Sequence, residues 1–397
     1  MKKHYTVLII GGGTAGIMVA ARLLRSFKML HGNIGIVEPT DVHYYQPLWT
    51  LVGGGVLDKK KTGRNMRTVI PKEADWIKAR VESFSPYQNS ITTLDKNIFT
   101  YDYLVVAPGI QVNWNGIKGL RETLGKNNVC SNYSYEHVHY TWETIRTFKG
   151  GNAIFTHPNT PVKCGGAPQK IMYLAEDAFH KSGVRKQSNI IFESANPAIF
   201  DVEKYRKSLE KVIERKGINT YFREHLIEVE GEKKQAIFED LETGCRIKKN
   251  FQMLHVTPPM EAPTFIKNSL LADEKGWIDV HKYTLQHKSF SNIFGLGDAS
   301  NLPTSKTGAA IRKQAPVVVK NIIDLMQGRP LEAQYDGYSS CPIVTGYNKL
   351  VLAEFDYNKQ PKETMPFNQA IERRSMYYFK KYLLPMMYWR GMLKGRL

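Results

Sequence analysis

The chain has 397 residues, of which 42% are hydrophobic and 23% are charged. This balance excludes a disordered chain and is typical of a globular protein with two or three domains. Lysine and arginine exceed aspartate and glutamate by 55 to 37, so the formal net charge is +18. Such an excess favours an anionic partner, for example an acidic membrane surface or an anionic substrate. We expect no nucleic-acid partner, because the chain has no zinc-finger spacing and no RNA-recognition signature.

The cysteines argue against a secreted protein and against a metal site. Cys130, Cys164, Cys245 and Cys341 are too few and too scattered for a disulfide framework, and no two have the close spacing of zinc ligands. The N-terminus enters a strand-like run at once, and no apolar run is long enough to span a bilayer. These features predict a protein that binds no metal and that lies on the cytoplasmic side.

A GxGxxG motif lies near the N-terminus, between a strand-like run and a helix-like run. In such a unit Gly11 permits the tight turn, Gly13 lets a pyrophosphate approach the backbone, and Gly16 lets the helix pack on the strand. The next strand-like run ends at Glu38, 22 residues after Gly16. A carboxylate at this spacing accepts hydrogen bonds from a ribose. The sequence therefore predicts a dinucleotide-binding βαβ unit.

Two later turns favour FAD over NAD as the dinucleotide. Residues 101–109 read as a strand that ends in an Ala-Pro-Gly turn, and residues 292–299 read as a strand that ends in Gly-Asp. Both resemble recurring motifs of flavoproteins of the glutathione reductase type. In that resemblance Asp298 binds the ribityl or pyrophosphate end of FAD, and the helix that begins near Lys306 directs its positive N-terminus at the flavin.

A second dinucleotide-like unit begins at Gly151, but its first loop carries a cysteine in place of a glycine motif. A strand-like run at 152–156 and a helix-like run at 169–176 flank this loop, which contains Cys164. The positive end of the helix and Lys163 would both lower the pKa of a thiol at this position. The loop is therefore interpreted as a sulfur site. The alternative is a small apolar cysteine in a βα turn.

The other cysteines and two histidines carry less information. Cys130 has no basic neighbour in sequence and is interpreted as structural, and Cys245 as part of an exposed hairpin. His137 and His139 alternate as they would in a strand or turn, where a polar surface is favoured over a general base. Cys341 lies among turn residues.

The C-terminal residues combine aromatic and methionine side chains with basic ones. Residues 371–397 hold seven lysines and arginines against one glutamate. At helical spacing Met376, Phe379 and Leu383 share one side, and Pro385 is expected to break the helix. This pattern predicts an in-plane helix at an anionic membrane surface. The alternative is a terminal helix that docks on the core and exposes a basic face.

Together these features predict an α/β protein with two Rossmann-like dinucleotide-binding domains of the glutathione reductase type plus a C-terminal amphipathic membrane-associating segment. The expected division of the chain is a FAD-binding domain in two parts (1–111 and 263–330), a connector (112–150), a second dinucleotide-like domain with a redox cysteine (151–262), and a quinone and membrane region (331–397).

The motifs taken together closely resemble those of sulfide:quinone oxidoreductases, most of all the branch that includes the mitochondrial animal enzyme. The matching stretches cover nearly the whole chain and are GGGTAGI (11–17), HYYQPLWTLVGGG (43–55), NTPVKCGGAPQKIMYL (159–174), LHVTPPM (254–260), LGDASNLPTSKTGAA (296–310) and SSCPIVTGYN (339–348). The resemblance implies a membrane-associated FAD enzyme that oxidises sulfide and reduces a quinone, with Cys164 and Cys341 as its redox pair. With the motif glycines included, the expected FAD contacts are Gly11, Gly13, Gly16, Ile17, Glu38, Gln46, Val81, Ala107, Gly109, Asp298, Lys306, Thr307, Gly308 and Ala309.

The implied chemistry joins the two thiols through sulfur beside the flavin. Hydrosulfide attacks the bridge and leaves a persulfide on one cysteine, expected to be Cys164, and a thiolate on the other, expected to be Cys341 near the flavin. Sulfite, glutathione, cyanide or a second sulfide then removes the sulfane sulfur. Lys163 and other basic residues near the mouth are expected to attract these anions. The quinone is expected near the C-terminal apolar residues, with Tyr347 or Phe367 in its pocket.

Two other functions share parts of this pattern. A type II NADH:quinone oxidoreductase has the same architecture but needs a second glycine-rich turn near His157, which the sequence lacks. A flavin-carrying redox sensor would use the cysteines as a regulatory disulfide without turnover. The resemblance implies the cytoplasmic face of a bacterial membrane, or the mitochondrial inner membrane for a mature organellar form. It leaves open whether the chain forms a homo-oligomer.

Overall fold

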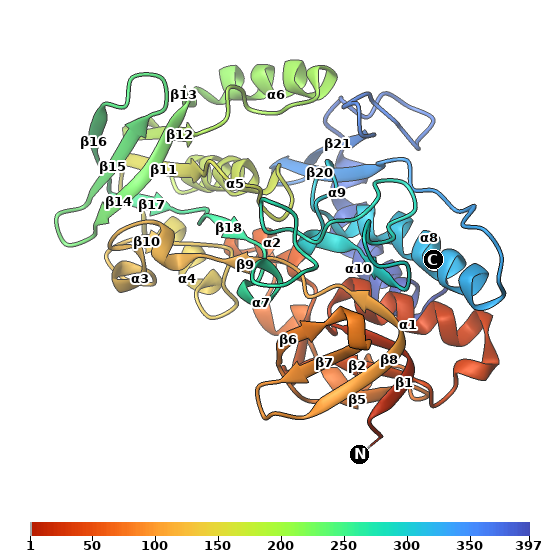
Figure 1. The fold of residues 1–397 in the computed structure, drawn as a ribbon. Coiled ribbons are helices and arrows are strands. Elements are labelled where there is room, and N and C mark those ends of the chain that lie inside the picture. The colour runs from red at the N-terminus through yellow and green to blue at the C-terminus, as the bar shows by residue number, and fades with distance from the viewer. Residues whose placement is uncertain (1) are drawn as a thin grey trace.

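The computed structural model describes residues 2–397, and its first unit is built on one sheet (Figure 1). The strand order is β5-β2-β1-β8-β7-β6, with β19 paired to β8. β5, β2, β1, β8 and β19 run parallel, and β7 and β6 form an antiparallel edge. The strands are β1 His4–Ile10, β2 Ile34–Val37, β5 Asp75–Ile77, β6 Val81–Ser85, β7 Ser90–Thr93, β8 Ile98–Val106 and β19 Ile293–Gly295.

The central strands of this sheet are apolar on both sides, which is why helices cover them. Leu8, Ile9 and Leu104 are completely buried, as parallel strands require. Helix α1 follows β1 directly and packs against α8, which returns from the last third of the sequence. The helices and the small antiparallel pair of this unit are α1 Thr14–Ser26, α2 Trp49–Gly53, α8 Gly308–Met326, β3 Val42–Tyr44 and β4 Gly63–Asn65.

The second unit repeats the parallel arrangement on a smaller scale. Its five parallel strands have the order β10-β17-β11-β12-β13, and β14-β15-β16 form a separate antiparallel sheet. Its strands are β10 Val129–Cys130, β11 Gly151–His157, β12 Ser188–Ser194, β13 Asn219–Phe222, β14 Glu224–Glu230, β15 Gln235–Asp240, β16 Arg246–Asn250 and β17 Met253–His255. Its helices are α3 Leu120–Thr123, α4 Val138–Thr147, α5 Ala167–Lys181 and α6 Glu203–Lys216.

Much of the expected connector belongs structurally to the second unit. Strand β10 is the edge strand of the five-stranded sheet, and Leu120 and Val129 are buried in the same core cluster as Leu254. A two-residue strand has no periodicity to reveal it in the sequence. The interpretation of the two histidines as strand or turn holds for His137, which lies in the turn before α4, and is wrong for His139, which lies inside that helix.

The chain crosses between the two units at one place. Strand β9 (Gln111–Val112) carries it out of the first unit, and β18 (Met260–Glu261) carries it back as the antiparallel partner of β9. The short helix α7 (Thr264–Lys267) follows the return. The outward and return crossings therefore lie side by side.

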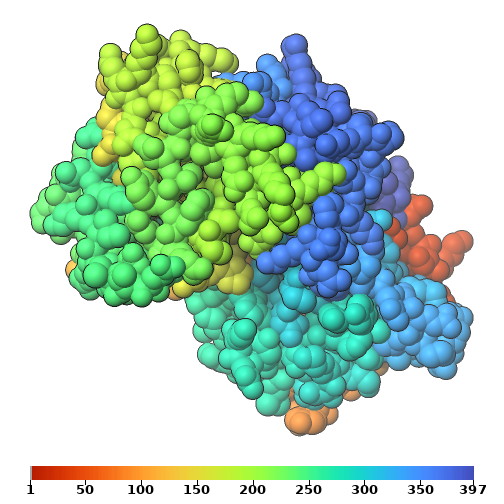
Figure 2. Space-filling model, turned by 90° about the horizontal axis from the view of Figure 1, so that it is seen from above, coloured from red at the N-terminus to blue at the C-terminus, as the bar shows by residue number. Residues whose placement is uncertain are grey.

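The hairpin of β20 (Ser339–Gly346) and β21 (Lys349–Phe355) carries Cys341 to the junction of the units. Strand β20 packs against α5 of the second unit and against α8 of the first. Viewed from above, the second unit and the C-terminal third form adjacent lobes (Figure 2). Cys341 therefore lies on a strand inserted between two helices, although the sequence placed it among turn residues.

The predicted break at Pro385 is wrong, because the helix continues through it. Helix α9 (Arg374–Tyr378) passes through a π-helical turn (Phe379–Leu383) into α10 (Leu384–Arg390), with Pro385 in the first turn of α10. The π-helical turn directly before Pro385 shifts the register of the backbone hydrogen bonds, so the missing amide hydrogen of proline does not end the helix. In residues 2–397 no helix combines the length and the apolar character that crossing a membrane requires.

The C-terminal helix has a docked part and an exposed part. Tyr388, Trp389, Met392 and Leu393 are buried, and the end of the chain packs against α1, where Arg22 Nε donates a hydrogen bond to the Leu397 carbonyl at 3.2 Å. The large exposed side chains are Tyr378, Tyr382, Leu383 and Met386, which we call the tail patch. The predicted apolar side is therefore partly wrong, because only Leu383 of the three predicted residues belongs to the patch.

Leu393→Ala should destabilise the first unit. The side chain is 1% exposed, and its loss leaves a cavity under α1 that should lower the free energy of unfolding by about 2–5 kcal/mol. Met386→Ala removes a side chain that is 46% exposed and should change the free energy by less than about 0.5 kcal/mol. Denaturant titration of both variants measures the difference, and equal values would contradict the docked position of the tail.

Candidate redox site

Cys164 and Cys341 meet at the junction of the two units. Their Sγ atoms lie 3.1 Å apart, although 177 positions separate them in sequence. Cys164 lies in the loop between β11 and α5, and Cys341 is completely buried in β20. The structure thus brings together the two cysteines that the sequence resemblance paired.

Three segments are fastened to one another around this pair. The Cys164 amide donates to the Lys306 carbonyl at 2.8 Å, which joins the cysteine loop to the segment before α8. Ser339, two residues before Cys341, donates to the Ser305 carbonyl at 3.1 Å, and its hydroxyl lies 2.9 Å from that of Thr307. The segment at 305–307 therefore positions both cysteines.

The backbone at Cys164 is in the left-handed region, with φ at 56°. A residue other than glycine pays roughly 1–2 kcal/mol for this conformation, and such strain is concentrated at functional sites. Two residues later, a Cβ on Gly166 would lie 2.6 Å from the Cys341 sulfur. The glycine is therefore required for the close approach of the two segments.

The environment favours a thiolate at Cys164 and a thiol at Cys341. The hydrogen bond from Cys341 holds the pKa of Cys164 well below its ordinary value, and Lys170 reinforces this effect against burial. Lys170 Nζ donates to Cys164 Sγ at 3.1 Å. The same contact with Cys164, followed by burial, raises the pKa of Cys341 well above its ordinary value. Burial by itself would lower the pKa of Lys170, but the Cys164 thiolate and the hydrogen bonds to the sulfur pair outweigh it and raise that pKa.

The lysine expected beside the thiolate was the wrong one. Lys163 Nζ donates instead to Gln46 Oε1 at 2.8 Å, and burial lowers its pKa. The lysine that contacts Cys164 is Lys170, one turn into α5, and its signal in the sequence was a single charge inside an otherwise apolar helical run. A second buried lysine, Lys380, comes from the π-helical turn of the tail and donates to the Pro47 carbonyl at 3.2 Å.

Lys380 has a pKa close to neutral pH. Burial, and then the charge of Lys170, lower its pKa to about 7, although the two sulfurs oppose the shift. The side chain is 4% exposed. The C-terminal segment therefore contributes a titrating group to the surroundings of the cysteine pair, which the sequence did not reveal.

The N-terminal glycine loop has the geometry of a dinucleotide cradle. A Cβ on Gly16 would lie 1.9 Å from the Gly11 carbonyl oxygen, so the helix can approach the loop only with glycine there. A Cβ on Gly13 would meet no described atom within 4 Å, which leaves this part of the loop accessible. Glu38 accepts a hydrogen bond from the Gly12 amide at 2.8 Å through Oε2. These residues fit a pyrophosphate at the N-terminus of α1 and a ribose beside Glu38.

The remaining predicted contacts gather around the same end of the sheet. Ala107 and Gly109 follow β8, and Asp298 follows β19, so their turns lie at the carboxyl ends of parallel strands. Burial raises the pKa of the Asp298 carboxyl, whereas burial lowers the pKa of Lys306 to about 8. The others take these positions: Ile17 in α1, Gln46 in the turn after β3, Val81 at the start of β6, and Thr307, Gly308 and Ala309 at the start of α8, where Thr307 caps the helix.

A hydrogen-bonded cluster joins the glycine loop to the C-terminal helix. His43 is buried, and its Nδ1 lies 3.0 Å from the Gly12 carbonyl oxygen. Its Nε2 lies 2.5 Å from the Tyr388 hydroxyl, which is also 2.8 Å from the Thr14 hydroxyl. Burial lowers the pKa of His43, so the imidazole is neutral and can donate on one side and accept on the other. Residues 388–397 are therefore part of the cradle's support.

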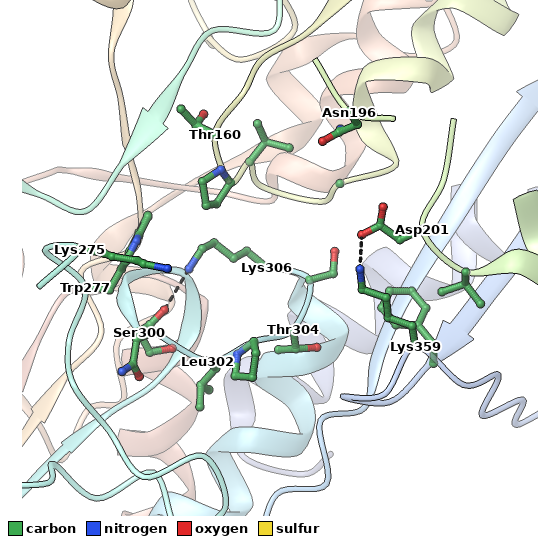
Figure 3. Close-up of a pocket in the computed structure, with 18 of the residues that line it drawn as sticks. Thr160, Asn196, Asp201, Lys275, Trp277, Ser300, Leu302, Thr304, Lys306 and Lys359 are labelled. Atoms are coloured by element: carbon green, nitrogen blue, oxygen red, sulfur yellow. Dashed lines mark hydrogen bonds and ion pairs between the residues drawn. The ribbon is translucent and has the colours of Figure 1, made fainter. Parts of the chain in front are cut away.

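A cavity of about 930 Å³ lies next to the cysteine loop (Figure 3). Gly165, the neighbour of Cys164, belongs to its wall, together with segments after β12 and around Ser300. Four lysines and five carboxylates line it, and Lys359 is paired with Asp201 at 2.9 Å. The expected excess of basic residues at the mouth is therefore absent from this wall.

The two remaining cysteines lie apart from the pair. Cys130 is completely buried, and burial raises its pKa to about 12, as expected for a structural thiol. Cys245 is exposed beyond the turn between β15 and β16. Among residues 2–397 there is no group of histidine, cysteine and acidic side chains that could hold a metal ion.

Two dinucleotide-type units with a cysteine pair at their junction define the flavin-dependent disulfide oxidoreductase class. The family model described as pyridine nucleotide-disulphide oxidoreductase matches residues 5–146. The chain is 48% identical to the mitochondrial sulfide:quinone oxidoreductase of Dictyostelium discoideum and 47% identical to that of Mus musculus, over 100% and 99% of this chain and 87% of each relative. It belongs to the sulfide:quinone oxidoreductase family.

A solved structure shows the same fold. The sulfide:quinone oxidoreductase of Aquifex aeolicus superposes with a TM-score of 0.83 at 21% identity, over 100% of this chain and 92% of that one. The type II NADH:quinone oxidoreductase of Staphylococcus saprophyticus matches only 29% of this chain, at 25% identity. The NADH-oxidising class is therefore a distant relative.

Lys170→Met should raise the pKa of the Cys164 thiol, because it removes the positive charge 3.1 Å from the sulfur. The pKa of Cys164 is depressed in the folded protein, so the reduced native protein should react with iodoacetamide even at low pH. In the variant the same reactivity should appear only at higher pH. Rates of iodoacetamide alkylation measured against pH give the shift. Lys163→Met is the matched control, and a control shift as large as that of Lys170→Met would contradict the assignment.

Proposed function

We propose that this protein oxidises sulfide at the Cys164–Cys341 pair and passes the electrons through FAD to a quinone. The observation that carries the proposal is the 3.1 Å approach of the two sulfurs at a strained loop position, beside a dinucleotide cradle. Family membership at 47–48% identity over nearly the whole chain supports the same reaction.

The gap between the sulfurs fits a bridge through one added sulfur. A direct disulfide needs about 2.05 Å, whereas two successive S–S bonds of that length reach up to about 4 Å. Hydrosulfide forms a new bond to Cys164 Sγ, the bridge bond at that atom breaks, and its electron pair passes to the sulfur on the Cys341 side. The product is a persulfide on Cys164 and a sulfur anion at Cys341. Lys170 and the N-terminus of α5 stabilise negative charge at Cys164, both in the persulfide and in the thiolate that remains when the outer sulfur leaves.

FAD is the flavin that fits the cradle, because the loop at Gly13 and the carboxylate of Glu38 suit a pyrophosphate and an adenosine ribose, which FMN lacks. When bound, it supplies a two-electron acceptor that a quinone can reoxidise. Thr307 and the N-terminus of α8 would face the flavin ring, where a positive potential favours the reduced anion. The predicted contacts from Gly11 to Ala309 are proposed in these roles.

The sulfane sulfur leaves through the cavity beside Gly165. An acceptor nucleophile such as sulfite, glutathione, cyanide or a second sulfide forms a bond to the outer sulfur of the persulfide, and the Cys164 thiolate is the leaving group. The volume of about 930 Å³ admits a molecule as large as a tripeptide. Because lysines and carboxylates nearly balance along the wall, attraction of anions to the sulfurs depends on Lys170 rather than on a basic mouth.

An NADH-oxidising function is disfavoured by the second unit itself. The acidic residue at the end of its second strand, Glu193, would have to receive the adenosine ribose. It is completely buried and is paired with Lys249 at 2.7 Å, and Lys249 also contacts Glu224. The ribose position is therefore occupied by an internal ion pair.

The tail patch is proposed to contact a membrane, from which the quinone would enter. Tyr382 is 60% exposed and Met386 46% exposed, and the basic residues Arg374 and Lys381 lie beside the rings of the patch. The named relatives are mitochondrial, so a mitochondrial membrane is the proposed location. The cytoplasmic face of a bacterial membrane stays a prediction, as does a homo-oligomer.

Cys164→Ser and Cys341→Ser should each abolish reduction of the bound flavin by sulfide, because each removes half of the bridge. Stopped-flow absorbance of the flavin, with sulfide and separately with NADH, measures this. The native protein should respond to sulfide and be at least about tenfold slower with NADH. Rapid reduction by NADH would support the other enzyme class, and full turnover in either serine variant would contradict the two-cysteine scheme. A redox sensor predicts no turnover in the native protein.

Replacing Tyr382 and Leu383 together by serine should weaken binding to vesicles of mixed phosphatidylcholine and phosphatidylglycerol by at least about tenfold, because two apolar side chains are lost from the interface. Flotation of the vesicles measures binding. Met29→Ser, at a side chain that is 77% exposed outside the tail patch, is the control. Unchanged binding of the double variant would contradict the membrane role of the tail patch.

A further inference from the structure

Unpartnered polar atoms gather where two parallel strands of the second unit end. Asn132 Oδ1, Tyr133 OH, His255 Nδ1 and Thr257 Oγ1 are buried and have no hydrogen-bond partner within residues 2–397. Buried polar groups are normally paired, and each exception asks for an explanation. Four exceptions at the ends of two neighbouring parallel strands, β10 and β17, point to a ligand rather than to separate packing faults.

The topology places this cluster beside the sulfur pair. Strands β10, β17 and β11 are parallel neighbours, so the residues that follow them lie at one edge of the sheet. Tyr133 follows β10, Thr257 follows β17, and the loop of Cys164 follows β11. From β11 the chain continues to β12 on one side, while β17 lies on the other. Crevices at such a reversal of strand order are the usual ligand sites of α/β folds.

Tyr133 is the member of the cluster whose pKa is affected by the charge of the cysteine pair. Burial raises its pKa well above the ordinary value, and the negative charge of Cys164 raises it further. The Thr257 hydroxyl is near enough to lower the pKa in part, but the two oxygens do not reach hydrogen-bond geometry. The phenol therefore stays protonated and keeps a free O–H donor near the sulfurs.

We propose that the Tyr133 and Thr257 hydroxyls form the polar wall of a hydrosulfide site beside the Cys164–Cys341 pair, in which Tyr133 donates a hydrogen bond to the reacting sulfur anion. This inference rests on the proposed function. As hydrosulfide bonds to Cys164 and the bridge bond breaks, the negative charge moves from the entering sulfur to the sulfur on the Cys341 side. A fixed neutral donor stabilises that charge without the reorganisation that water would need. Lys170 provides the positive charge at the site, and Tyr133 provides a hydrogen bond of fixed orientation.

Tyr133→Phe tests the donor, and the chain offers a matched control. Tyr101 also has a buried hydroxyl without a partner in residues 2–397, but burial alone raises its pKa and no cysteine contributes. In stopped-flow experiments Tyr133→Phe should slow flavin reduction by sulfide about 10- to 100-fold, whereas Tyr101→Phe should leave it within about twofold. Reoxidation of the reduced flavin by a short-chain quinone should be unchanged in both variants.

A second measurement is independent of turnover. In the reduced protein, Tyr133→Phe should raise the pH midpoint of iodoacetamide alkylation by about one unit, because the thiolate loses a donor. Thr257→Val should shift both readouts in the same direction by a smaller amount, and it keeps the test valid if the phenylalanine variant folds poorly. Rates and midpoints equal to those of Tyr101→Phe would overturn the inference. A native protein that sulfide does not reduce would instead overturn the proposed function.

Discussion

The approach of two sulfurs to 3.1 Å is the constraint on which the rest of the site depends. It requires a left-handed residue at Cys164, a glycine at position 166 and a strand inserted between α5 and α8. Each of these features alone is unfavourable or unremarkable. Together they hold two distant parts of the chain against the segment at 305–307, through the hydrogen bonds from Cys164 and Ser339. Because that segment leads into α8, the cysteine pair and the proposed flavin position are fixed by the same element.

The electrostatics of the pair follow from burial. A thiolate with little access to water needs a compensating charge, and Lys170 provides it as a direct hydrogen-bond donor. Two ammonium groups near one another would repel, and burial lowers the pKa of Lys380 to about 7, so the second lysine can lose its proton. The site thus holds one fixed positive charge and one that titrates near neutral pH. With the neutral phenol proposed at Tyr133, these donors differ in charge, but each would stabilise negative charge on sulfur.

The C-terminal segment serves the fold and the surface at once. Its buried residues support the glycine loop through Tyr388, His43 and Thr14, and its π-helical turn brings Lys380 to the cysteines. Its exposed residues form the tail patch. The tail patch, the support of the glycine loop and the lysine near the redox pair therefore belong to one short stretch of chain, so a displacement of this helix would affect all three.

The sequence by itself determined the class of the protein, because the glycine loop, its carboxylate and the spacing of the later turns are local features that need only a strand and a helix around them. The resemblance to sulfide:quinone oxidoreductases was likewise confirmed by the relatives. Only the tertiary structure decided which lysine faces the thiolate, where β10 belongs, that the helix runs through Pro385, and which buried hydroxyls have no hydrogen-bond partner in residues 2–397. Neighbours across strands and between helices depend on register and packing. Lys163 is adjacent to Cys164 in the chain, yet its Nζ donates to Gln46, a neighbour that only the packing of the two segments provides.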